Sequence, residues 1–147
     1  MARWASSVIV VAVRDPGDGR VRATTATSFA PVSAAPPQVV VSLGANAQAL
    51  PFVRVDGRVG VSLLGEDQRS WARIFADTFP VGPSPWADEG VPLIAGSVAA
   101  LSCTVRAIHP VAGGSRLVVA EVVDVGLGER ERPLLYWRRG YRTLAGD

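Results

Sequence analysis

The chain has 147 residues, of which 48% are hydrophobic and 19% charged, a composition typical of a folded protein and not of a disordered one. The formal net charge is +2, and all 15 basic residues are arginines scattered along most of the sequence, which argues against a nucleic-acid groove. No apolar run reaches the roughly 18 residues that a membrane span needs. We therefore expect a single domain over residues 1–147, located in the cytoplasm, without nucleic-acid or membrane partners.

The first third of the chain predicts strands joined by turns. Ser7–Val13 is a β-branched apolar run that predicts a buried strand, and Asp15–Gly19 supplies the Pro and Gly of a turn. Arg20–Phe29 then returns as the second strand of a hairpin. Pro31–Pro37 is expected to interrupt the sheet, because proline donates no hydrogen bond to a neighbouring strand. Gln38–Leu43 is continuously apolar and predicts a third strand, covered on both faces.

The middle of the chain changes period. Gly44–Ala49 is small and polar and predicts a loop that leads into a short helical turn. Arg58–Leu64 alternates between apolar and polar residues, as a fourth strand does. Glu66–Phe79 places its large apolar residues at helical spacing and predicts the main helix. Pro80–Pro92 carries four prolines and is expected to form a long loop.

The last third predicts strands again. Leu93–Ile108 indicates a long strand or a bent pair, and Pro133–Trp137 a short final strand. Leu117–Val125 is apolar on both faces except for Glu121 and Asp124, so it needs a second cover besides the core, for which a dimer partner is one candidate. About seven strands and one helix predict a small antiparallel barrel, closed or half-closed.

Candidate metal ligands are few. The chain has one cysteine, Cys103, which lies in an apolar segment and predicts an inert core residue. It has one histidine, His109, which rules out a site rich in histidine. This count leaves no spacing for an internal disulfide or a metal site.

A row of small hydroxyls marks the second predicted strand. Thr24, Thr25, Thr27 and Ser28 follow one another almost without interruption. Each hydroxyl needs a partner when it is buried, and leaving one unpaired costs about 1–3 kcal/mol. The row therefore predicts the wall of a polar groove, or a strand edge that meets a ligand. The alternative is a solvent-facing strand rich in threonine.

The order of several motifs resembles the flavin reductase-like domain family, the small components of two-component monooxygenases. The motifs span most of the chain and are Thr25–Phe29, Pro36–Pro37, Val39–Leu43, Gly60–Leu64, Leu117–Val122, Pro133–Tyr136 and Arg139–Tyr141. The resemblance implies a mainly β protein: a Greek-key, FMN-binding split β-barrel with one main helix and a long Pro-rich loop. It also implies a homodimer that transfers hydride from NADH or NADPH to FMN or FAD, and a monooxygenase that receives the reduced flavin.

The resemblance assigns candidate cofactor-binding residues by position and names no catalytic residue. It places the hydroxyl row along the flavin ring and ribityl chain, the segment after the third strand near the phosphate, Arg116 near a pyrophosphate or 2′-phosphate, and Tyr141 at the border. The full set is Thr24, Thr25, Ala26, Thr27, Ser28, Ser42, Gly44, Asn46, Gln48, Arg116 and Tyr141.

Two departures from the family pattern keep alternatives open. Gly44–Ala49 lacks the usual hydroxyl and basic residues, and the usual Gly-Asp-His is Gly114-Ser115-Arg116. Arg116 stays protonated at neutral pH and cannot act as a proton donor. The alternatives are a non-catalytic flavin-binding barrel, an interaction protein without flavin, and a reductase that uses a different reductant, such as a deazaflavin.

Overall fold

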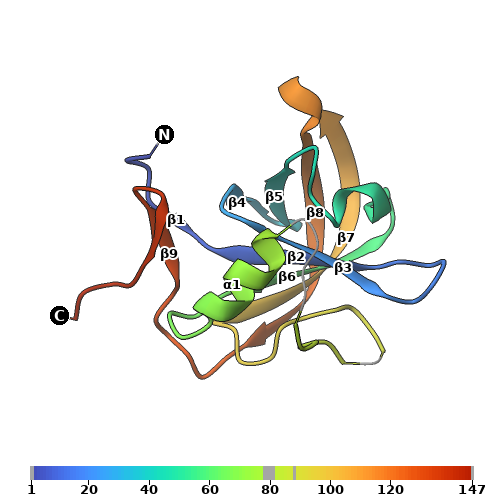
Figure 1. Cartoon of the computed structure of the whole chain (residues 1–147). Coiled ribbons are helices and arrows are strands. Elements are labelled where there is room, and N and C mark those ends of the chain that lie inside the picture. Colours follow the sequence, from blue (N-terminus) through green and yellow to red (C-terminus); the bar gives the residue numbers. More distant parts are fainter. Residues whose placement is uncertain (1, 78–81, 88, 147) are drawn as a thin grey trace.

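The computed structural model describes residues 2–77, 82–87 and 89–146, and most of its regular structure is antiparallel β-sheet (Figure 1). The elements, in chain order, are β1 (Ser6–Ser7), β2 (Ile9–Arg14), β3 (Val21–Ala26), β4 (Phe29–Ala34), β5 (Pro37–Leu43), the 3-10 turn η1 (Leu50–Phe52), β6 (Arg58–Leu63), α1 (Arg69–Ala76), β7 (Ala99–Pro110), the 3-10 turn η2 (Ala112–Gly114), β8 (Arg116–Leu127), β9 (Leu135–Trp137) and β10 (Gly140–Arg142).

Seven strands form one antiparallel sheet in the order β3-β2-β6-β7-β8-β5-β4. Its outer strands, β3 and β4, are separated in the chain by Thr27 and Ser28 alone, so the two edges of the sheet meet there. The Ser42 amide of β5 donates to the Ser28 carbonyl over 3.1 Å, which links the two sides. The sheet thus curls into a barrel with a seam at Thr27–Ser28. A second sheet, β1-β9-β10, lies beside it, where both chain ends are found (Figure 1).

Strand β2 is buried on both faces, which explains its unbroken apolar sequence. Ile9, Val11 and Val13 belong to the core inside the barrel. Val10 and Ala12 face outward into a second apolar cluster, where α1 covers the sheet (Figure 1). Burying an aliphatic side chain of this size contributes about 1.5–3 kcal/mol, so both clusters draw stability from this strand.

Three of the predicted strand boundaries are wrong. The strand predicted over Arg20–Phe29 ends at Ala26, and Phe29 is the first residue of β4. Pro31 does not interrupt the sheet but lies inside β4. Because β4 is an outer strand, the missing amide of proline costs no central ladder bond, and the pairing with β5 is irregular between Pro31 and Ser33. Leu93–Val98 is not part of a strand, because β7 begins at Ala99.

The main helix is confirmed, but it is shorter than predicted. It spans Arg69–Ala76, and the predicted helical residues Thr78 and Phe79 lie outside the described part of the chain. Of the predicted Pro-rich loop, residues 82–87 and 89–92 are irregular. Within the described ranges, no helix has the length and apolar character needed to cross a bilayer.

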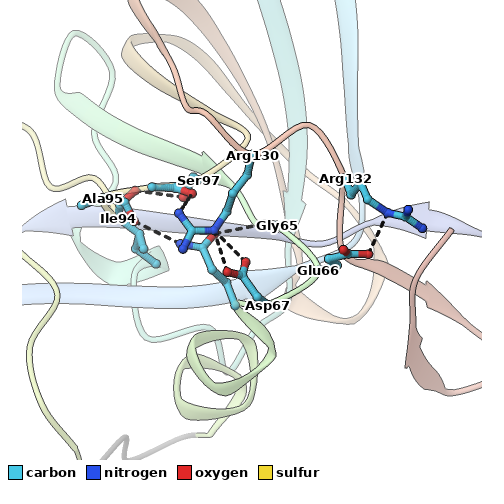
Figure 2. A network of polar contacts seen from close by, with 10 residues as sticks. Gly65, Glu66, Asp67, Ile94, Ala95, Ser97, Arg130 and Arg132 are labelled. Carbon is cyan, nitrogen blue, oxygen red and sulfur yellow. Dashed lines mark hydrogen bonds and ion pairs between the residues drawn. The ribbon is translucent and has the colours of Figure 1, made fainter. Parts of the chain in front are cut away.

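Ion pairs tie the segment before α1 to distant loops (Figure 2). The Arg130 Nε donates to both carboxylate oxygens of Asp67, over 2.7 and 2.9 Å, and its Nη1 donates to the Gly96 carbonyl over 2.7 Å. Beside it, the Arg132 Nε donates to Glu66 over 3.1 Å. These contacts join three segments that are far apart in the sequence.

The segment 92–98 is also held by close backbone contact. The buried Gln68 side chain donates from Nε2 to the Ala95 carbonyl over 3.1 Å. Gly128 approaches the same segment so closely that a Cβ there would lie 1.9 Å from the Ser97 carbonyl oxygen. Segment 92–98, at the C-terminal end of the Pro-rich loop, is therefore fixed to the barrel.

Candidate functional site

A cavity opens where the hydroxyl row passes the loop after β5. Its volume is about 320 Å³, within the range of ligand sites. We call it the loop cavity, and its lining residues are Thr24, Thr25, Gly44, Ala45, Asn46, Ala47, Gln48, Phe75, Ala76 and Asp77. Thr24, Thr25, Gly44, Asn46 and Gln48 were predicted from the sequence as cofactor-binding residues. The structure brings these five together from β3 and the loop.

Both threonines of the loop cavity are oriented by the protein itself. The Thr24 Oγ1 accepts a hydrogen bond from the Ala49 amide over 3.2 Å, so its own proton is available to a ligand acceptor. The Thr25 Oγ1 donates to the Ala72 carbonyl of α1 over 2.7 Å. Its proton is therefore engaged, and toward a ligand it can act as an acceptor only. Toward a ligand, the Thr24 hydroxyl can therefore donate a hydrogen bond, whereas the Thr25 hydroxyl can only accept one.

A second cavity, of about 520 Å³, lies at the other end of the hydroxyl row. We call it the hairpin cavity because β9 and the turn that joins it to β10 form one wall. It is lined by Ala2, Trp4, Ser6, Thr27, Ser28, Tyr136, Arg138 and Arg139. Thr27 and Ser28, two further predicted residues, therefore belong to it. The Ser28 Oγ donates to the Ser42 carbonyl over 2.7 Å, so Ser42, also predicted, pairs with Ser28 across the barrel seam.

The turn between β9 and β10 presents two arginines. Arg138 and Arg139 both have positive φ, 49° and 59°, which few residues other than glycine and asparagine adopt readily. The Arg138 amide donates to the Ala2 carbonyl over 2.8 Å, and the Trp137 Nε1 donates to the Arg3 carbonyl over 3.2 Å. The turn is thereby fixed to the N-terminal segment, and the Arg138 guanidinium lies 4.3 Å from the Trp137 ring centre.

The other predicted residues line neither cavity. Ala26 packs against the barrel core. Arg116 lines a third cavity, which shares Ala45 with the loop cavity, and its Nη1 donates to the Gly114 and Ser115 carbonyls. Tyr141 packs edge-on against Tyr136, with ring centres 5.6 Å apart, and burial raises the pKa of its hydroxyl.

Aromatic and charged residues that the sequence did not assign to the site also line it. Phe75, whose spacing predicted a core residue, is 7% exposed and lines the loop cavity beside Asp77. Trp4, 76% exposed, lines the hairpin cavity. No local pattern marked Trp4 or Asp77, since each lies outside the long strands and the helix. Trp86 anchors the Pro-rich loop, because its ring is partly buried and lies 5.1 Å from that of Phe75.

Comparison with known proteins identifies the family. The family described as "Flavin reductase like domain" matches residues 1–145 of this chain. The chain belongs to this family. The resemblance inferred from the motif order is therefore confirmed, and so is the split-barrel fold, which the structural neighbours in this family share.

Three relatives show what this flavin reductase-like chain is similar to. The reductase component of 4-hydroxyphenylacetate 3-monooxygenase from Thermus thermophilus is 39% identical, covering 98% of this chain and 92% of that protein. NADH:riboflavin 5′-phosphate oxidoreductase from Streptomyces pristinaespiralis is 34% identical, covering 97% and 84%. The structure of Streptomyces globisporus C-1027 NADH:FAD oxidoreductase SgcE6 in complex with NAD and FAD fragments matches with a TM-score of 0.82 and 30% identity, covering 99% and 89%.

The residues present in this family member fit a flavin nucleotide. Two cavities of ligand size lie at the ends of one row of hydroxyls, and that row offers both a donor, Thr24, and an acceptor, Thr25. Aromatic rings, Phe75 at one end and Trp4 at the other, suit a planar heterocycle. Among the described residues, no group of three or more His, Cys, Asp or Glu side chains is placed to hold a metal ion.

Proposed function

We propose that this protein is an NAD(P)H:flavin oxidoreductase that binds FMN or FAD and transfers hydride from the nicotinamide to the flavin. The observation that carries the proposal is the convergence of Thr24, Thr25, Gly44, Asn46 and Gln48 on one cavity of a flavin reductase-like barrel. Relatives that act on riboflavin 5′-phosphate or FAD with NADH support the same chemistry.

The flavin would lie along the hydroxyl row, between the loop cavity and the hairpin cavity. From Thr24 to Ser28 the chain advances by four residues, at most about 13 Å at 3.3 Å per residue, because Thr27 is a bend. This is the scale of a tricyclic ring with its side chain. The seam at Thr27–Ser28 leaves backbone groups at the rim of the hairpin cavity, and such groups tune flavins by hydrogen bonding to the ring.

Bound flavin and nicotinamide supply the hydride chemistry themselves. The task of the chain is to hold the two rings in contact and to exclude water, since orientation alone lowers a barrier substantially. Thr24 and Thr25 orient the ligand through fixed hydroxyls. Phe75 and Trp86 form the apolar backing of α1, which keeps the wall of the loop cavity rigid.

The product of this reaction, reduced flavin, would be passed to a monooxygenase. Support comes from the relative of 39% identity, which is the reductase component of such an enzyme. We further propose that the chain acts as a homodimer. Val125 and Leu127 of β8 are 50% and 82% exposed and alternate along the strand after a bulge at Val123, itself 46% exposed; they form an apolar ridge that a second copy would cover.

Residues 1–147 would act as one flavin reductase-like domain, which is supported by β2, because that strand contributes to both apolar clusters. The protein would work in the cytoplasm, where reduced nicotinamide cofactors are available.

A non-catalytic flavin-binding role is the second candidate. It is favoured by Gly114-Ser115-Arg116, which replaces the expected Gly-Asp-His, and by the contacts of Arg116, whose guanidinium donates to its own turn. Under this alternative the groove would bind flavin without turnover.

The test is steady-state oxidation of NADH and NADPH with added FMN, FAD or riboflavin. We expect turnover with at least one pair and a clear loss of flavin affinity in the Thr27→Val/Ser28→Ala variant. Thr104→Val/Ser33→Ala removes the same kinds of atom from residues that line neither cavity, and serves as the control. Binding without turnover would select the second candidate, and equal flavin affinity in all three proteins would remove the hydroxyl row from the site.

A further inference from the structure

The two cavities at the ends of the hydroxyl row differ in charge. Among the described residues that line the hairpin cavity, two are arginines, Arg138 and Arg139, and none is acidic. Among those that line the loop cavity, the charged residue is a carboxylate, Asp77. A phosphate is attracted to guanidinium groups. Of the two cavities, the hairpin cavity is therefore the one whose charged side chains suit a phosphate.

From this asymmetry we propose that the Arg138–Arg139 turn is the phosphate-recognition element of this protein. The proposal rests on the proposed function. It departs from the expectations that the Ser42–Gln48 segment faces the flavin phosphate and that Arg116 pairs with a pyrophosphate or 2′-phosphate. Arg116 lies in a separate cavity and donates to backbone carbonyls of its own turn.

The backbone of the turn supports a role for its side chains. Both arginines have positive φ, which Asn-Gly would adopt with less strain in a two-residue hairpin. The conformation of the turn therefore does not call for arginine at either position. Strained residues of this kind gather at functional sites.

The surroundings of the two arginines suit a phosphate attached to an aromatic heterocycle. The exposed Trp4 ring and the Tyr136 ring line the same cavity, together with the Thr27 and Ser28 hydroxyls. Two hydrogen bonds, one from a backbone amide and one from an indole, hold the turn against residues 2–3, so both arginines are attached to a fixed backbone. The ligand class is a nucleotide whose base stacks on an aromatic ring and whose phosphate pairs with arginine.

Two nucleotides of the proposed reaction carry this chemistry, the flavin and the nicotinamide reductant. The experiment compares wild type with Arg138→Gln/Arg139→Gln, measuring the Kd of FMN and of riboflavin by fluorescence titration and the KM of NADH. If the flavin phosphate is recognised, the Kd of FMN rises about tenfold, equal to about 1.4 kcal/mol, while that of riboflavin stays unchanged. If the phosphates of the reductant are recognised, the KM of NADH rises by a similar factor and both flavin Kd values stay unchanged.

Controls separate charge from folding. Arg138 also packs on Trp137, so the single Arg139→Gln variant is measured alongside, with the unfolding temperature of each protein. Arg138→Lys/Arg139→Lys keeps the charge and is expected to restore most of the affinity. Higher salt should narrow the gap between FMN and riboflavin in wild type.

Arg116→Gln is the matched variant in the separate third cavity. A selective loss of FMN affinity in Arg116→Gln, with none in the Arg138/Arg139 variants, would overturn the proposal. So would an unchanged Kd of FMN and an unchanged KM of NADH in the double Gln variant. If wild type oxidises neither NADH nor NADPH, the proposed function fails, yet the FMN and riboflavin titrations still decide whether this turn recognises phosphate.

Discussion

The Thr25 hydroxyl donates a 2.7 Å hydrogen bond to the Ala72 carbonyl, across the contact between β3 and α1. Thr25 thus has two roles, of which the sequence predicted only ligand binding. It lines the loop cavity, and it fixes the helix whose last residues, Phe75 and Ala76, form the opposite wall. A change at this side chain should therefore affect both stability and ligand binding.

Thr25→Val keeps the shape of the side chain and removes this hydrogen bond. We expect a loss of about 1 kcal/mol in the free energy of unfolding, together with weaker flavin binding, because the cavity wall is less well fixed. Chemical denaturation and flavin titration measure the two effects. Thr27→Val, in the hairpin cavity, should weaken binding with a smaller loss of stability. A Thr25→Val protein as stable as wild type would contradict this account.

Two neighbouring glycines make a matched pair at the end of β8. A Cβ at Gly128 would lie 1.9 Å from the Ser97 carbonyl oxygen, whereas at Gly126 the nearest atom, the Ala100 oxygen, is 4.0 Å away. Gly128→Ala should destabilise the protein by about 1–3 kcal/mol or more, and Gly126→Ala by no more than about 0.5 kcal/mol. Denaturant midpoints of the two variants test this; equal midpoints would mean that segment 92–98 is not packed as described.

The Asp67–Arg130 pair predicts a pH dependence of stability. The hydrogen bond from Arg130 holds the pKa of the Asp67 carboxyl below its usual 3.8. A group whose folded pKa is depressed contributes stability above its unfolded pKa and loses it as pH falls through the folded value. Unfolding temperatures of wild type should therefore fall more steeply below about pH 4 than those of Asp67→Asn. Parallel curves for the two proteins would remove this pair from the acid response.

Cys103 should be unreactive in the native protein. Its side chain is fully buried in the barrel core, and burial raises the pKa of the thiol to about 11. Since the thiolate is the reactive form, a thiol reagent at neutral pH should label the protein only after unfolding. Rapid labelling under native conditions would show that the barrel core opens.

The apolar ridge on β8 predicts the assembly state. Leu127, 82% exposed, should be covered in the proposed homodimer, so Leu127→Lys should shift the protein toward a monomer. Val111→Lys places the same charge on a residue 43% exposed in the turn region, and should leave assembly unchanged. Analytical ultracentrifugation distinguishes the two. A wild-type monomer would contradict the proposed homodimer.

Local sequence patterns predicted the barrel strands other than β4, because these strands either alternate or are continuously apolar. They predicted the loop cavity because its residues lie on a strand and on the loop just after another strand, close to recognisable motifs. The hairpin cavity was harder to foresee. Trp4 and Arg138 are far apart in the sequence, and the strands that bring them together, β1 and β9, have two and three residues, too few for a periodic signal.

Proline at position 31 was misleading for a related reason. The rule that proline interrupts sheets holds for central strands, and the sequence alone does not tell which strand is outermost. Pro31 lies inside a strand because that strand, β4, is at the edge of the sheet.

The seam at Thr27–Ser28 has a consequence for how long the folded protein survives. A nucleotide lying along this seam would contact both outer strands of the sheet, β3 and β4, and would add interactions between them. Occupancy and resistance to heat would then rise together, by mass action. A reductase that releases its product after each cycle would alternate between a more stable flavin-bound barrel and a less stable flavin-free one. Its lifetime would then depend on how quickly the next flavin binds.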